Sequence, residues 1–115
     1  MYLTAAEALA RSNQDAKAKE YLQALLKERD PEYKDLGNTG AKLADEIMTH
    51  RRIELWGEGF RWFDLKRLGL PLDRTGSNFD ATFCDFLHKD PNADGWIFEI
   101  PKKETDFNDL IEKNY

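Results

Sequence analysis

Two glutamates near the middle of the sequence have the spacing of a catalytic pair. Glu54 and Glu58 lie one helical turn apart, close to two tryptophans, and glycoside hydrolases cleave their substrates with two carboxyl groups that flank the bond. Each glutamate has an arginine three residues away, Arg51 before the first and Arg61 after the second. A positive neighbour keeps a carboxylate ionised, so neither residue suits a general acid. Because nucleophile elbows, phosphate loops and histidine metal motifs are also missing from the sequence, we predict no enzyme and no cofactor.

A group of potential oxygen ligands lies later in the chain. Asp90, Asn92 and Asp94, followed by Gly95, match the first half of a calcium-binding loop, in which alternate carboxylate and amide oxygens surround the ion. The twelfth position of such a loop requires a glutamate, but Pro101 occupies it. An EF-hand is therefore not expected. Two interpretations remain, a different calcium-binding turn or a solvated turn built from ordinary turn-forming residues.

Three tryptophans offer aromatic faces on which a sugar ring can stack. Trp56 and Trp62 lie at helical spacing with other large apolar residues, which favours burial in a helical core. Trp96 follows a turn and is the more open candidate for ligand contact, although Ile97 and Phe98 beside it favour strand packing. Trp96 is thus a weak ligand-binding candidate, and the ligand-binding residues are otherwise unknown.

Helices are expected to position these side chains, and the first two should form a hairpin. Apolar residues recur at helical spacing over residues 1–12, and a second helix begins at Asp15, whose carboxylate can cap it. This helix ends before Asp30-Pro31, because a residue that precedes proline disfavours helical geometry. Small residues at Ala6 and Ala18 allow the two helices to approach closely. The pair resembles a single tetratricopeptide unit.

A longer helix is predicted from about Ala41 to Trp56, with Thr39 as its N-cap, after a loop over residues 31–40. Two glycines at positions 57 and 59 interrupt it, and a further helix extends from Phe60 to about Leu68. Residues 69–95 read as a long irregular loop, and residues 96–100 as a short extended segment. The predicted fold is therefore mainly α, a tetratricopeptide-like hairpin with further packed helices.

The composition of the chain argues against several classes of partner and site. The chain has 115 residues, is 41% hydrophobic and carries a net charge of −5, which argues against a nucleic-acid partner because phosphate binding requires a basic surface. A lone cysteine cannot form an internal disulfide, and Cys84 with His88 gives too few ligands for a metal site. A run of about 18 apolar residues, as a membrane span requires, is also missing from the sequence.

The most distinctive stretch covers residues 46–67 and reads EIMTHRRIELWGEGFRWFDLKR. It resembles the C-terminal signature of SusD/RagB-like outer-membrane proteins, in which R-R-x-E-L leads into E-G-x-R-W-F-D-L-x-R. The opening MYLTAAEALAR resembles that family's E-M-Y-L-x-x-A-E-A helix. The closing I-P-x-x-E and later N and Y resemble the end of the family, at positions Ile100, Pro101, Glu104, Asn108, Asn114 and Tyr115.

This resemblance implies that residues 1–115 are the C-terminal domain of a longer nutrient-binding lipoprotein of the cell outer membrane, with the lipid anchor in a missing N-terminal part. It implies a SusC-like TonB-dependent transporter as partner and a glycan or other nutrient as ligand, and it makes this piece mainly scaffold. Exposed helix faces could also produce a homodimer of the isolated chain. A generic tetratricopeptide-like protein-interaction module is the alternative.

Overall fold

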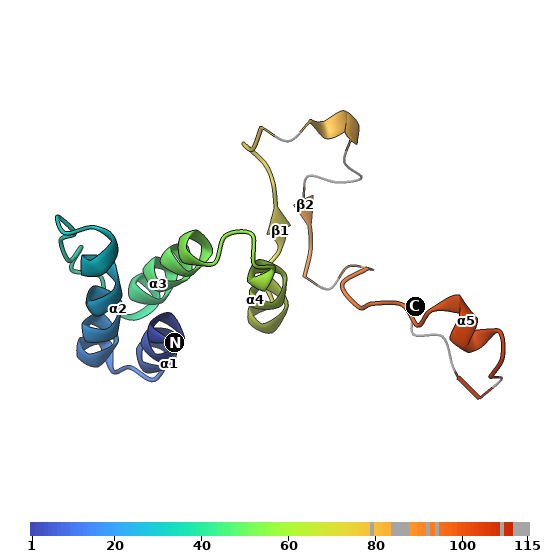
Figure 1. Ribbon diagram of the computed structural model, residues 1–115, viewed down its shortest axis with the longest axis horizontal. Helices are drawn as coiled ribbons and strands as arrows, with labels where there is room; N and C mark the ends of the chain where they lie inside the picture. Colours follow the sequence, from blue (N-terminus) through green and yellow to red (C-terminus); the bar gives the residue numbers. More distant parts are fainter. Residues whose placement is uncertain (79, 84–87, 92, 94, 109, 112–115) are drawn as a thin grey trace. The chain divides into compact units, whose positions relative to one another are not determined.

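The computed structural model describes residues 1–78, 80–83, 88–91, 93, 95–108 and 110–111. It divides into two compact units, Met1–Phe60 and Arg61–Tyr115, each of which is described by itself (Figure 1). The described elements are helices with a single two-stranded sheet, so the predicted mainly α fold is confirmed.

Three helices make up the first unit, α1 (Tyr2–Arg11), α2 (Asp15–Arg29) and α3 (Gly40–Glu54). α1 packs against both of the others, whereas α2 and α3 meet much less (Figure 1). The predicted α1–α2 hairpin is confirmed, and the small side chains of Ala6 and Ala18 are completely buried where the helices approach. The core consists of one cluster of small and aliphatic side chains, Leu3, Ala6, Ala10, Ala18, Leu22, Leu26, Leu43 and Ile47.

The N-terminus of α3 is capped by a residue from another helix. Thr39 occupies the predicted N-cap position, but its side chain makes no capping hydrogen bond. Instead, the backbone N–H of Gly40 donates to Oδ2 of Asp15, at 2.8 Å. This contact joins the first residues of α2 and α3. The prediction that Asp15 caps its own helix α2 is wrong, because Asp15 is the first helical residue and Gln14 occupies the N-cap position.

The loop between α2 and α3 is fastened to both helices. The Tyr33 hydroxyl donates to Oε1 of Glu46 at 2.9 Å, and Nδ2 of Asn38 donates to Oε2 at 2.8 Å. Asp35 accepts a hydrogen bond from Gln23 on α2, at 3.2 Å. Glu46 is almost fully buried, and a buried carboxylate is costly unless both oxygens have donors. The two loop side chains supply those donors.

The second unit contains short elements, α4 (Phe60–Leu68, which begins at the last residue of the first unit), β1 (Leu72–Asp73), η1 (Ala81–Phe83), β2 (His88–Lys89) and α5 (Lys102–Thr105). β1 and β2 pair antiparallel within the predicted irregular loop, with Leu72 opposite Lys89. Residues 96–100 adopt bends and irregular backbone. The strand packing predicted around Trp96 is therefore wrong.

Candidate functional site

The distinctive segment, residues 46–67, uses its charged side chains mainly to hold helices. Glu54, at the end of α3, receives the Arg29 guanidinium from the end of α2, with Nε–Oε2 at 3.0 Å and Nη2–Oε1 at 2.5 Å. The sequence favoured Arg51 as the partner of Glu54. Arg51 instead donates to Oγ1 of Thr4 on α1, at 3.3 Å, and its guanidinium lies 5.5 Å from the ring centre of Phe60.

A second ion pair of the segment joins Asp64 and Arg67, which lie three residues apart in α4. Arg67 donates from Nε to Oδ1 of Asp64 at 2.9 Å, within α4. Asp64 is buried whereas Arg67 is partly exposed, so the arginine supplies a donor to a carboxylate that has left water. The pairing predicted between Glu58 and Arg61 stays a prediction. Glu54, Arg51 and Asp64 of this segment therefore each bond to another side chain of the protein.

Glu54 is a poor candidate for acid catalysis. The hydrogen bond from Arg29 is the main cause that lowers the pKa of the Glu54 carboxyl below its ordinary value, and the charge of Arg29 acts in the same direction. A general acid needs a raised pKa so that it holds a proton near neutral pH. The sequence analysis also predicts that Glu54 is ionised, but it assigns the effect to Arg51. The arginine that bonds to Glu54 is Arg29, 25 residues earlier in the chain.

The core position predicted for Trp56 is wrong, because its side chain is 86% exposed. α3 ends at Glu54, two residues before the predicted end, and Gly57 follows with φ of 81°. A positive φ is accessible to glycine at little cost and turns the chain away from helical geometry. The helix therefore ends before Trp56, and the helical spacing that predicted burial does not apply to this residue. Ile53 and Phe63, three residues before and seven residues after Trp56, are also mostly exposed.

Trp62 and Trp96 form the aromatic centre of the second unit. Their rings stack with centroids 4.4 Å apart and planes inclined by 15°, and Phe98 lies 6.4 Å from Trp62. Trp96 is 4% exposed, and its indole N–H donates to the carbonyl oxygen of Asp90, at 2.5 Å. Buried tryptophans usually find such an acceptor. The placement accounts for Trp96 as a packing residue, and its role as a ligand contact stays a prediction.

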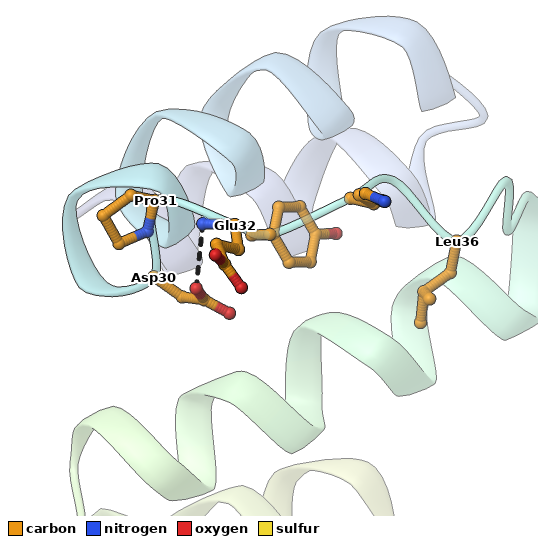
Figure 2. A pocket seen from close by; sticks show the side chains of 6 residues that line it. Asp30, Pro31, Glu32 and Leu36 are labelled. Carbon is orange, nitrogen blue, oxygen red and sulfur yellow. Dashed lines mark hydrogen bonds between the residues drawn. The ribbon is translucent and has the colours of Figure 1, made fainter.

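Two of the open hollows formed by described residues lie on the first unit. The larger, of about 780 Å³, follows α2 and is lined by Asp30, Pro31, Glu32, Tyr33, Lys34 and Leu36. Figure 2 shows these side chains along the loop that leads from α2, with the backbone N–H of Glu32 donating to Oδ1 of Asp30 at 2.9 Å. Tyr33 is the aromatic residue there, and its hydroxyl is already bonded to Glu46.

The second hollow, of about 390 Å³, is lined by Thr49, Arg52, Ile53 and Trp56. Sequence reasoning missed this site, because it placed Trp56 in the core and assigned no task to Arg52. The two glycines after Trp56 were the available signal. They predicted a helix break, and a break two residues earlier than expected leaves the tryptophan in solvent.

A comparison with known families gives the identity of the fold. A model of the SusD family matches residues 1–115. The chain belongs to the SusD family. No curated protein and no solved structure matches it. Membership of the SusD family supports a role in nutrient binding, and the resemblance carried by residues 46–67 is confirmed.

The SusD-family chain offers little support for a metal centre in its described part. Asp90 lies beside His88, with Nε2 and Oδ1 at 3.2 Å, and its carbonyl oxygen binds Trp96. Asn92, Asp94 and Cys84 lie outside the described residues. Among the residues that are described, no three His, Cys, Asp or Glu side chains gather as a metal site would require. The calcium-binding turn at Asp90, Asn92 and Asp94 therefore stays a prediction.

Over the same described residues, every helix is too short or too polar to span a bilayer.

Proposed function

We propose that this chain is the C-terminal, mainly structural domain of a nutrient-binding protein in an outer-membrane uptake system of the SusC/SusD type. The observation that carries the proposal is the match of the SusD family to all 115 residues. In this proposal the whole protein is lipid-anchored at the cell surface, captures a glycan or oligosaccharide, and passes it to a SusC-like TonB-dependent transporter, while this domain mainly supplies scaffold.

The contacts of the distinctive segment support the structural part of the proposal. Glu54 joins α3 to α2 through Arg29, and Arg51 joins α3 to α1 through Thr4. Both contacts are exposed to solvent, so each adds little stability and acts mainly to orient the helices. The segment therefore holds the helices of the first unit in one arrangement. Ligand contact belongs to exposed surface, and we propose no catalytic residue.

A tetratricopeptide-like interaction module is the second candidate, favoured by the α1–α2 hairpin with its buried alanines at positions 6 and 18. Such units stack on neighbouring helices and present a surface to another polypeptide. The two functions predict different ligands, glycans for the first and a protein segment for the second.

A glycan-array screen of the folded 115-residue chain separates the two candidates. Circular dichroism first shows that the chain is folded, and the proposal expects saturable binding to one class of glycan. A folded chain that binds no glycan would contradict capture by this domain. Size-exclusion chromatography with light scattering then tests the proposed homodimer, which a clean monomer would exclude.

A further inference from the structure

The hollow at the end of α3 combines an exposed aromatic face with a positive charge. Trp56 is almost fully exposed and Ile53 is 66% exposed, and together with Thr49 and Arg52 they line a volume of about 390 Å³. Ligand sites in proteins commonly range from roughly 300 to 1,000 Å³ and pair apolar walls with a few polar groups. The hollow has both properties.

Local geometry brings these side chains together. Thr49, Arg52 and Ile53 lie three and four residues apart on α3, so they share one side of the helix. Trp56 follows three residues after Ile53, in the turn that Gly57 completes with a positive φ. The site thus stands on a helix whose opposite side is anchored by the buried residues Leu43 and Ile47.

Arg52 differs from the other arginines of the first unit in having no hydrogen-bond or ion-pair partner among the described residues. Arg29 binds Glu54, Arg11 binds Glu7, and Arg51 binds Thr4. Among the described side chains, no carboxylate lies within ion-pair distance of Arg52, which is exposed. An unpaired guanidinium beside an apolar face can hold a planar anion through two parallel hydrogen bonds. A carboxylate is such an anion.

We infer that this hollow binds an acidic sugar, a uronic acid unit of an oligosaccharide. The apolar face of the pyranose ring stacks on the indole of Trp56, and the ring carboxylate binds the guanidinium of Arg52. The Thr49 hydroxyl donates to the carbonyl oxygen of Asp45 at 2.9 Å, which leaves its lone pairs free to accept from a sugar hydroxyl. The inference rests on the proposed glycan-binding function and narrows its substrate class.

The larger hollow, which follows α2, has the opposite charge. Its lining includes the carboxylates of Asp30 and Glu32 and the single ammonium of Lys34, and it offers an acidic sugar more repulsion than attraction. Tyr33 cannot present its hydroxyl there because Glu46 holds it. The preference for an acidic ligand is therefore a property of the Arg52 hollow.

Calorimetric titration tests the inference with two probes of similar shape, an oligogalacturonate and a neutral galacto-oligosaccharide. The wild-type chain should bind the oligogalacturonate roughly tenfold or more tightly than the neutral probe, since a hydrogen bond to a charged group is of this size. Arg52→Gln should abolish the preference for the oligogalacturonate, and Trp56→Ala should weaken the binding of both probes. Lys42→Gln is the matched control, because it removes an exposed positive charge elsewhere on α3.

Each outcome decides a separate question. Equal binding of both probes, or an equal loss in Lys42→Gln and Arg52→Gln, would overturn the acidic-sugar site and leave glycan binding intact. In another outcome, the chain binds other glycans on the array with an affinity that neither Trp56→Ala nor Arg52→Gln changes. That result would overturn the acidic-sugar site but not glycan binding by the domain. A folded wild-type chain that binds no glycan on the array would instead contradict all glycan capture by this domain. Circular dichroism of each variant confirms that the substitutions leave the helices intact.

Discussion

The two units of this chain exclude water from their interiors in different ways. Met1–Phe60 buries small and aliphatic side chains contributed by three helices, with Leu22, Leu43 and Ile47 almost entirely inaccessible. In Arg61–Tyr115 the described buried residues are few, and a stacked pair of tryptophans takes the place of an aliphatic cluster. In the first unit, three helices pack closely enough for small and aliphatic side chains to fill the core. In the second unit, which has short elements and long loops, two large aromatic rings provide much of the buried apolar surface.

Buried carboxylates are held in two ways, and this difference does not follow the division into units. Glu46 of the first unit is held by neutral donors from a loop, Tyr33 and Asn38. Asp64 of the second unit is held by Arg67, three residues along the same helix. The first arrangement depends on tertiary structure, because the donors come from outside α3. The second is a contact within one helix, and Glu7 of the first unit is bonded in the same way by Arg11 on α1.

The largest effect is expected from Trp96→Ala in the second unit. Replacing a buried tryptophan with alanine typically costs about 3–5 kcal/mol of unfolding free energy, and the change also separates the stacked rings. Stacked indoles couple excitonically, so the far-ultraviolet circular dichroism couplet should disappear. Trp56→Ala is the control, since that exposed ring should change stability by less than about 0.5 kcal/mol. A couplet that persists in Trp96→Ala would contradict the stacked pair.

Leu22→Ala tests the aliphatic core of the first unit. We expect a loss of about 2–5 kcal/mol in the free energy of unfolding, measured by denaturant titration, because the leucine is 1% exposed and its removal leaves a cavity. Leu36→Ala removes the same atoms from an exposed position and should have little effect. If both variants lost equal stability, the cluster around α1 and α2 would not be the core of this unit.

The sequence predicted most of the first unit because its signals are local. The helical spacing of Leu3, Ala6 and Ala10 and the Asp30-Pro31 break are sufficient to place α1 and the end of α2. The misassigned partners share a different cause. The contacts from Arg29 to Glu54 and from Asp15 to Gly40 each join residues 25 positions apart, and no spacing rule within one helix can find them.

The aromatic residues were harder to place for a related reason. Trp56 has core-like spacing, but its burial depended on whether α3 continued for two more residues. Trp96 was read as the open tryptophan because it follows a turn, although it is buried against Trp62, 34 positions earlier in the chain. The candidate site at Arg52 became visible only when the exposed face of α3 and the ion pairs of its neighbours were known.

A smaller effect is expected from Glu46→Gln, which tests the dependence of this carboxylate on loop donors. The amide oxygen can still accept from Nδ2 of Asn38, but the NH2 group then donates to the Tyr33 hydroxyl oxygen, and the Tyr33 hydroxyl hydrogen loses its acceptor. A buried polar group without a partner costs about 1–3 kcal/mol, which denaturant titration would show. Asp45→Asn, on the exposed side of α3, is the matched control. Equal stability of wild-type chain and Glu46→Gln would mean that the loop contributes no net stability through Glu46.

The smallest effect is expected from Arg29→Gln, and its sensitive measure is the pKa of Glu54. The arginine lowers this pKa in the folded chain, so the pair stabilises the fold above the ordinary carboxyl pKa, and the contribution disappears as pH falls through the lowered value. Both side chains are exposed to solvent screening, so the change in stability should be small. Carboxyl NMR titration of Arg29→Gln should show the Glu54 pKa rising toward its ordinary value, whereas Arg11→Gln should leave it unchanged. If the pKa stays low in Arg29→Gln but rises when Arg51→Gln is added, Arg51 can replace the distant partner, and the local pairing expected from the sequence competes with the tertiary one.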